Sequence, residues 1–156
     1  MKKLLPDCDQ EFVMTLVLDL DETLIHTVFD FTTYADFTVS LPITRETAAF
    51  QTDFDKNYIT AYVSIRPGAK HFLELLKQYY EIVIWTASPK DYADPILEAM
   101  GIKDTVTRVL TKEDCRRTQD NMYKDLDDLN RDVKRVVIVD DNELCYVKHP
   151  ERGIKV

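Results

Sequence analysis

The sequence predicts an α/β fold, a parallel β-sheet flanked by helices, with a small antiparallel β insert after the first strand. Three short apolar runs, residues 13–18, 81–86 and 135–139, suit strands that are covered on both faces. Segments with helical spacing of apolar residues lie between the later runs. This alternation favours parallel strands joined by crossovers, and such sheets form their sites at the carboxyl ends of the strands.

Two amphipathic helices are predicted. The first follows Pro67 and Gly68 and ends before Glu81. Its apolar face is expected to consist of Phe72, Leu75, Leu76 and Tyr79. The second covers residues 89–100 and stops at Gly101. Its apolar face is expected to consist of Tyr92, Ile96, Leu97 and Met100.

The insert is indicated by aromatic and β-branched residues in segments 29–39 and 58–65, between the first strand and the first helix. We place it at about residues 28–65. Its polar, acid-rich middle, about residues 44–57, is expected to form a mobile loop. A length of 156 residues favours one domain, residues 1–156, that includes the insert.

Composition narrows the classes of partner. A net charge of −8 disfavours direct nucleic-acid binding, which depends on clustered Lys and Arg. The same charge repels anions, so a phosphate ligand would need a local positive site made by a metal, a lysine or oriented amides. With only 3 glycines, a glycine-rich phosphate loop is not expected.

The cysteines and the N-terminal residues indicate the cellular compartment of the protein. Cys8, Cys115 and Cys145 lie far apart in the sequence, which fits reduced thiols in a nuclear or cytoplasmic protein. Pro6, Asp7 and Asp9 interrupt the opening apolar residues, so neither a secretory signal nor a membrane segment is expected.

Acidic residues follow two of the predicted strands. Asp19 and Asp21 come directly after the first strand and, one residue apart, can face the same pocket. Asp140 and Asp141 follow the last strand, at the same edge of the sheet. Clustered carboxylates cost stability unless a cation compensates, and ligands that are all oxygen favour Mg²⁺. A solvated turn is the alternative for an isolated Asp-x-Asp pair.

Two further residues could contact a phosphate. Thr86 closes the second strand and offers its hydroxyl and the neighbouring amides, although a threonine there is commonly only a turn residue. Lys124 could supply a positive charge, although a single lysine on an acidic protein is commonly a surface group. The acidic residues described above favour the phosphate-binding interpretation of both residues.

In chain order these residues resemble the haloacid-dehalogenase superfamily of phosphotransferases, which has a Rossmannoid sheet. The resemblance is closest to the FCP/SCP-type (NLI-interacting-factor-like) RNA polymerase II C-terminal-domain phosphatases. The matching segments are Asp19 to Thr27, Arg66 to Gly68, Trp85 to Ser88, Tyr92 to Pro95, Tyr123 to Leu126 and Val137 to Asp140.

The resemblance implies a Mg²⁺-dependent protein serine phosphatase that acts through an aspartyl-phosphate intermediate on phosphoserine-proline segments, such as those of the RNA polymerase II C-terminal domain. Asp19 would be the nucleophile and Asp21 the acid and base. The implied metal ligands are Asp19, the Asp21 carbonyl and Asp140 or Asp141. Thr86, Ala87 and Lys124 would bind the phosphate. The implied substrate-binding residues are Phe29, Leu41, Ile43, Tyr92 and Lys112, in part an apolar groove for proline.

Ordinary packing of the insert is the alternative for Phe29, Leu41, Ile43 and Tyr92. The sequence also departs from the family pattern. Lys112 stands where arginine is usual, and Asp141 where asparagine is common. The insert loop is longer than in small members, and the chain ends at Val156, where relatives are expected to continue into a closing segment.

Two alternatives from other functional classes remain. The first is a catalytically weak or inactive binding module resembling the mitochondrial presequence-translocase receptor of the same fold, against which the retained Asp19 and Asp21 count. The second is a small-molecule phosphatase of the superfamily, disfavoured by the insert and by the lack of a separate cap domain. The expected partner is a phosphorylated protein or peptide, and the expected state is a monomer.

Overall fold

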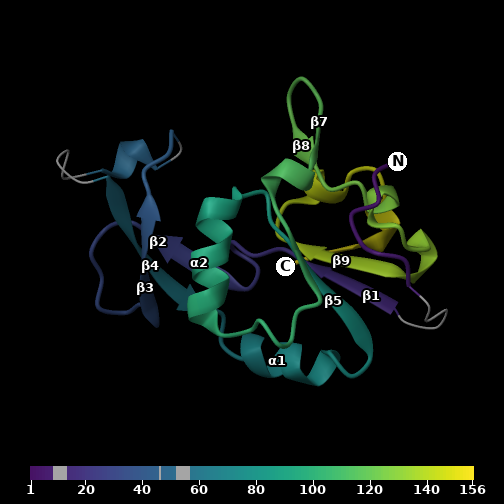
Figure 1. The fold of residues 1–156 in the computed structure, drawn as a ribbon, viewed down its shortest axis with the longest axis horizontal. Coiled ribbons are helices and arrows are strands. Elements are labelled where there is room, and N and C mark those ends of the chain that lie inside the picture. Colours follow the sequence, from purple (N-terminus) through teal and green to yellow (C-terminus); the bar gives the residue numbers. More distant parts are fainter. Residues whose placement is uncertain (9–13, 46, 52–56) are drawn as a thin grey trace.

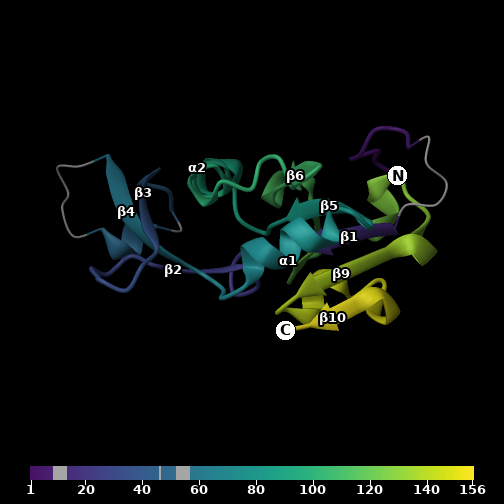
Figure 2. The same ribbon diagram turned by 90° about the horizontal axis from the view of Figure 1, so that it is seen from below.

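The protein, a computed structural model, is described for residues 1–8, 14–45, 47–51 and 57–156. Its central sheet has five parallel strands in the order β10-β9-β1-β5-β6. The bounds are β1 Met14–Leu18, β5 Tyr80–Trp85, β6 Arg108–Leu110, β9 Val136–Asp140 and β10 Gly153–Lys155. The three predicted strands are therefore the centre of the sheet, as Figures 1 and 2 show. Val13 of the first predicted strand lies outside the described residues.

Strand β1 is covered on both faces, as its unbroken apolar run predicts. Leu16 and Leu18 join one core cluster, with residues of β5, both helices and the insert. Val17 joins a second cluster, with residues of β9 and with Leu5 from the N-terminal segment. Alternate side chains of a strand point to opposite faces, so the two clusters lie on opposite sides of the sheet.

The helices are α1, Ala69–Leu76, and α2, Lys90–Met100. The predicted face of α2 is confirmed for Ile96, Leu97 and Met100, which are buried. In Figures 1 and 2, α2 lies between the insert and the central sheet, and it contacts strand β3 of the insert.

The predicted apolar face of α1 is confirmed for Leu76, which packs against the core cluster, and is wrong for the other three residues. Phe72 and Leu75 are 42% and 48% exposed, and Tyr79, beyond the helix end, is 71% exposed. The buried stripe instead contains Ala69 and Leu73. Helical spacing identified an apolar periodicity correctly, but two adjacent stripes of α1 carry apolar residues and only docking on the sheet selects one.

The insert is a three-stranded antiparallel sheet in the order β2-β4-β3, which confirms the predicted class. Its strands are β2 Ile25–Val28, β3 Phe37–Pro42 and β4 Tyr58–Ile65, so it begins slightly before the predicted residue 28. Ala48–Phe50 form a 3₁₀ turn in the predicted loop 44–57. Residues 46 and 52–56 of that loop lie outside the described residues.

Short elements escaped the sequence analysis. They are strands β6 and β10 at the sheet edges, the hairpin of β7 Arg116–Arg117 and β8 Met122–Tyr123, and five further 3₁₀ turns, Lys112–Asp114, Leu126–Leu129, Val133–Arg135, Glu143–Tyr146 and Pro150–Arg152. Segments of two to four residues are too short to show a periodicity. They matter because several carry or support residues of the site described below.

None of the helices in the described ranges has the length and apolar character needed to cross a bilayer. Cys8, Cys115 and Cys145 form no disulfide, as predicted.

Candidate active site

The sheet register brings the first and last strand ends together. Leu18 of β1 pairs with Ile84 of β5 and with Val139 of β9. Asp19 and Asp140 therefore follow at the same level on neighbouring strands, and the Asp19 amide donates to the Val139 carbonyl at 3.0 Å. The acids that the sequence placed at one edge of the sheet do meet there.

Lys124 lies between these two acids. Its Nζ donates to Asp19 Oδ1 at 2.8 Å and to Asp140 Oδ2 at 2.6 Å, and the lysine is 1% exposed. Burial by itself would lower the pKa of Lys124, but the carboxylates of Asp19 and Asp140 outweigh it and hold that pKa above its usual value. The lysine is therefore a fixed positive charge inside an acidic protein, and the surface-group alternative is wrong.

Asp19 is buried more deeply than a solvated turn would allow. Burial raises the pKa of Asp19 to about 6, with a further contribution from Asp140, and the Lys124 ammonium opposes both. The Thr23 hydroxyl donates to the second oxygen, Oδ2, at 3.3 Å. Both oxygens of the Asp19 carboxylate thus accept hydrogen bonds. The single positive charge of Lys124 does not balance the negative charges of Asp19 and Asp140 together.

A cation could be held beside Asp19. One carboxylate oxygen from each of Asp19, Asp140 and Asp141 lies within 4.8 Å of the others. Asp140 is 1% exposed and uses Oδ2 for Lys124 and Oδ1 for the Asn142 amide, at 2.9 Å. Asp141 is only partly buried. An excess of carboxylate oxygens over positive charge fits a hard divalent cation such as Mg²⁺, and Asp141 is the less engaged of the two terminal acids.

Asp21 lies on the other side of the same loop, toward α2. Its Oδ1 accepts a hydrogen bond from the Tyr92 hydroxyl, and its Oδ2 accepts one from Ser88 Oγ at 3.0 Å. Burial raises the pKa of Asp21, and the two hydrogen bonds work against that rise. Burial also raises the pKa of Tyr92, so its hydroxyl remains a donor.

The loop that carries both acids is fixed by its backbone and by Arg66. Glu22 has a positive φ of 61°, a conformation that costs a non-glycine residue energy and turns the chain sharply. Arg66 Nε donates to the Thr23 carbonyl at 2.5 Å, and its Nη2 donates to the Glu22 carbonyl at 3.0 Å. The segment Arg66 to Gly68, noted in the sequence without a role, therefore clamps this turn.

Thr86 and Ala87 lie in the loop that follows β5. Thr86 is 1% exposed, its amide donates to Leu110 at 3.0 Å and its Oγ1 accepts from the Ser88 amide at 3.0 Å. Because that hydroxyl acts as an acceptor within the loop, its own proton stays available for an anion.

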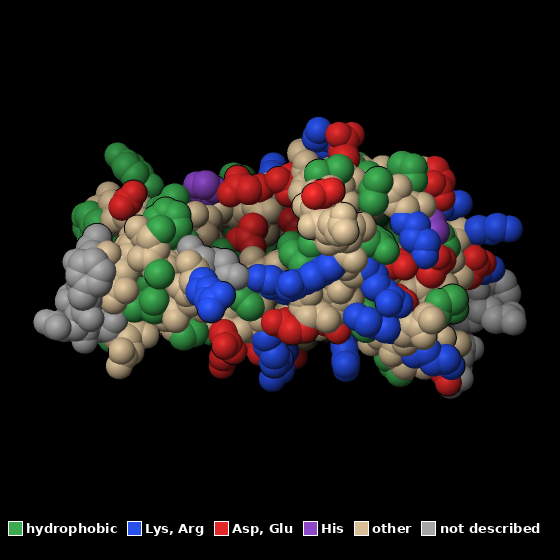
Figure 3. Space-filling model, turned by 90° about the horizontal axis from the view of Figure 1, so that it is seen from above, with side chains coloured by type: hydrophobic (Ala, Val, Ile, Leu, Met, Phe, Trp, Pro, Cys, Tyr) green, Lys and Arg blue, Asp and Glu red, His purple; other side chains and the backbone are tan. Residues whose placement is uncertain are grey.

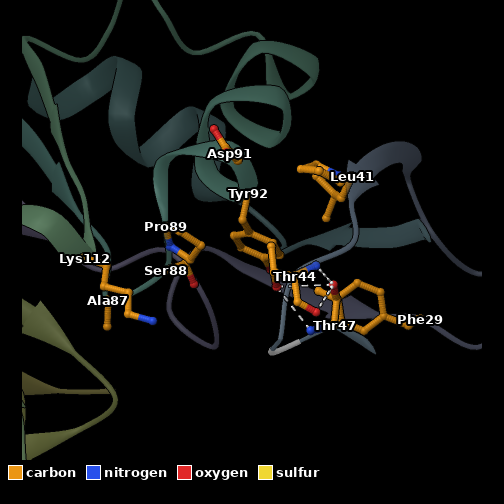
Figure 4. Close-up of a pocket in the computed structure, with 11 residues that line it drawn as sticks. Phe29, Leu41, Thr44, Thr47, Ala87, Ser88, Pro89, Asp91, Tyr92 and Lys112 are labelled. Atoms are coloured by element: carbon orange, nitrogen blue, oxygen red, sulfur yellow. Dashed lines mark hydrogen bonds between the residues drawn. The ribbon is translucent and has the colours of Figure 1, made fainter. Parts of the chain in front are cut away.

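A pocket of about 270 Å³ opens beside Ser88 and Tyr92. Figure 4 shows it between the insert, which provides Phe29, Leu41, Thr44 and Thr47, and the segment from Ala87 to the start of α2. Pro42, Ala87, Ser88, Pro89, Asp91, Tyr92 and Lys112 complete the lining.

Four of the five predicted substrate-binding residues, Phe29, Leu41, Tyr92 and Lys112, line this pocket. Ile43 is not among the residues that line the pocket, and it packs against the core cluster, as Phe29 and Tyr92 also do.

The face that carries the site is not uniformly acidic. In Figure 3 the surface is hollowed near its middle, acidic side chains lie deep in the hollow, and Lys and Arg side chains form a row beside it. This row offsets locally the net charge of −8, which by itself would repel an anionic ligand.

Sequence analysis missed the supporting hydroxyl groups. The sequence indicates Ser88 and Thr27 only as parts of longer motifs, and it indicates Tyr92 only through its ring, as a groove residue. The available signal was weak: Ser88 follows Thr86 in the same loop after a buried strand. The contact of Tyr92 with Asp21 joins residues 71 apart in the sequence and required the fold.

Comparison with known proteins gives related sequences over nearly the whole chain. Phosphatase PSR1 of Saccharomyces cerevisiae is 33% identical over 141 residues, covering 90% of this chain and 30% of that protein. A probable C-terminal domain small phosphatase of Dictyostelium discoideum is 38% identical over 142 residues, covering 91% and 43%. The human carboxy-terminal domain RNA polymerase II polypeptide A small phosphatase 1 is 34% identical, covering 90% and 50%. The chain thus spans half or less of the length of these relatives.

A solved structure has the same fold. Fission yeast RNA polymerase II CTD phosphatase Fcp1, bound to beryllium fluoride, matches with a TM-score of 0.70 and 25% identity, over 94% of this chain and 42% of that one. The family model for NLI interacting factor-like phosphatase matches residues 14–156. Together with the acids, the lysine and the antiparallel insert, this match places the chain in the NLI interacting factor-like phosphatase family, the FCP/SCP group of the haloacid-dehalogenase superfamily.

Proposed function

We propose that this chain is a Mg²⁺-dependent protein phosphatase that hydrolyses phosphoserine through an aspartyl-phosphate on Asp19. The observation that carries the proposal is the arrangement around Asp19: a buried lysine at 2.8 Å, and oxygens of Asp140 and Asp141 within 4.8 Å. A carboxylate repels a phosphoryl group unless nearby positive charge compensates. Here Lys124 supplies one such charge, and the acidic oxygens can hold another.

In the first step, an Asp19 oxygen attacks phosphorus while the bond from phosphorus to the serine oxygen breaks. The departing serine oxygen takes a proton from Asp21. In the second step, a water molecule gives one of its own protons to the Asp21 carboxylate, which restores the acid, and the water oxygen attacks phosphorus. The bond from phosphorus to Asp19 then breaks, which releases inorganic phosphate and restores the Asp19 carboxylate.

The metal would be held by the Asp19 carboxylate, the Asp21 carbonyl and Asp141. Of the two terminal acids Asp141 is the preferred ligand, because both oxygens of Asp140 accept hydrogen bonds, from Lys124 and from the Asn142 amide. A bound Mg²⁺ would neutralise negative charge on the phosphoryl oxygens. The Thr86 hydroxyl, the Ala87 amide and Lys124 would donate to those oxygens and orient the group for attack.

The pocket favours a protein substrate over a small metabolite. Its wall includes the rings of Phe29, Pro89 and Tyr92, adjoining the Ser88 hydroxyl that reaches Asp21. Such a wall suits a rigid proline next to the phosphorylated serine. RNA polymerase II C-terminal-domain phosphatases are among the relatives, so phosphoserine-proline segments of that domain are the proposed substrate and the nucleus the proposed compartment.

The proposal is tested by replacing Asp19 with asparagine and assaying p-nitrophenyl phosphate and a phosphoserine-proline peptide with Mg²⁺. An amide cannot act as the nucleophile, so both activities should disappear. Asp104→Asn, at an exposed position away from the site, is the matched control and should keep both. Full activity of the Asp19 variant would exclude the mechanism. Peptide binding by the unmodified chain without turnover at any Mg²⁺ concentration would favour the binding module instead.

A further inference from the structure

The carboxylate of Asp21 has a hydroxyl donor on each of its two oxygens. Tyr92 donates to Oδ1, and Ser88 donates to Oδ2 at 3.0 Å. Asp21 is partly buried and directly follows the buried Leu20, just after the end of β1. Two donors at once fix both the position and the rotation of the carboxylate plane.

Each donor is in turn held from a different element. The Tyr92 hydroxyl lies 2.9 Å from Thr27 Oγ1, on strand β2 of the insert. The Ser88 amide donates to Thr86 Oγ1 at 3.0 Å, and the Ser88 carbonyl accepts from the Lys112 amide at 3.0 Å. The orientation of Asp21 is therefore tied to the insert on one side and to the loop after β5 on the other.

The hydrogen bonds that fix Asp21 are separate from those that fix the nucleophile, Asp19. Asp19 is bound by Lys124 and Thr23, whereas Asp21 is bound by Tyr92 and Ser88, and the two sets share no side chain. Loss of a hydroxyl from the second set should consequently disturb Asp21 and leave Asp19 in place. That separation makes a selective test possible.

We propose that Tyr92 and Ser88 are positioning residues, which aim the Asp21 carboxyl at the oxygen of the leaving serine. The inference rests on the proposed function, because it requires Asp21 to be the proton donor. Proton transfer needs donor and acceptor within hydrogen-bond reach, and a shift of about 1 Å can cost on the order of 100-fold in rate. Tyr92 thus has a role beyond that of a pocket wall.

The test compares kcat/KM for two leaving groups. A serine alkoxide needs a proton to depart, whereas p-nitrophenolate leaves readily without one, and kcat/KM reports the steps up to that departure. Tyr92→Phe keeps the ring that lines the pocket and removes only the hydroxyl. We expect this variant and Ser88→Ala to lower kcat/KM for a phosphoserine peptide by about 10- to 100-fold, with a loss of no more than a few-fold for p-nitrophenyl phosphate.

Two further variants serve as controls. Ser88→Thr keeps a hydroxyl and should recover much of the phosphoserine activity lost in Ser88→Ala. Tyr62→Phe, on β4 of the insert, is the matched tyrosine control and should behave as wild type. Equal losses for both substrates, or no loss, in Tyr92→Phe and Ser88→Ala would overturn the inference.

Asp21→Asn separates this inference from the function on which it rests. If that variant loses phosphoserine activity selectively and the hydroxyl variants do not, the positioning role is wrong and the proposed function stands. If Asp21→Asn shows no dependence on the leaving group, Asp21 is not the acid, and the proposed mechanism fails with the inference.

Discussion

The ammonium group of Lys124 lies 2.6 Å from Oδ2 of Asp140, and both side chains are 1% exposed. A buried charge pair of this kind contributes little relative to apolar packing, but removing one member leaves the other without compensation. The pair therefore links the stability of the site to its chemistry.

Lys124→Met should lower the free energy of unfolding by about 3–5 kcal/mol and abolish phosphatase activity. The cause is that Asp19 and Asp140 are left as two buried carboxylates with no cation between them. Adding Asp140→Asn removes one of these charges, so the double variant should regain part of the stability and none of the activity. Urea unfolding of the wild type, both single variants and the double variant measures the coupling. Strictly additive changes would contradict the buried ion pair.

Asp141→Ala should raise the Mg²⁺ concentration for half-maximal activity roughly tenfold or more, because it removes an oxygen ligand. Asp141→Asn keeps an oxygen that can bind Mg²⁺ and should have a smaller effect. Titration calorimetry of Mg²⁺ into each variant provides a readout that does not depend on turnover. If Asp140→Asn weakens Mg²⁺ binding more than Asp141→Ala does, the roles assigned to the two acids must be exchanged.

Arg66→Lys should reduce kcat about tenfold with a loss of about 1 kcal/mol in unfolding free energy. The guanidinium contacts the carbonyls of Thr23 and Glu22 together, and an ammonium group cannot reproduce that fork. Steady-state kinetics with p-nitrophenyl phosphate, paired with thermal unfolding, measures both effects. Arg45→Lys in the insert serves as the control, and an unchanged kcat in Arg66→Lys would mean that the turn holds its shape without the clamp.

Glu81 should make stability depend on pH in the acidic range. Burial by itself would raise the pKa of Glu81, but hydrogen bonds from Arg131 and Thr15 outweigh it and lower that pKa. A lowered folded-state pKa means that the stabilisation is present above the unfolded pKa, about 4.3, and is lost as pH falls through the folded value.

Glu81→Gln should therefore cost about 1–3 kcal/mol at pH 7, and its difference from wild type should shrink below about pH 4. Urea unfolding between pH 7 and pH 3 measures this change, with Glu98→Gln as an exposed control. A difference between wild type and Glu81→Gln that stays constant over the whole range would show that the ion pair contributes nothing.

Prediction from the sequence succeeded where a pattern is local. Buried strands appear as unbroken apolar runs, and the strand register then requires the residues after Leu18 and Val139 to meet. It failed on α1, where apolar residues occupy two neighbouring stripes of the helix, and on the strands of two or three residues at the edges of the sheet. Neither the choice of stripe nor the pairing of so short a segment is encoded by periodicity.

By itself, the sequence determined the order of the elements, the antiparallel insert and the gathering of Asp19, Asp140 and Asp141, because chain order and strand ends suffice for these. Only the tertiary structure decided that Lys124 is buried between Asp19 and Asp140, that Arg66 clamps the turn, and that Tyr92 and Ser88 hold Asp21. These contacts join side chains distant in the chain, and their energies depend on burial and on hydrogen-bond geometry, which exist only once the chain has packed.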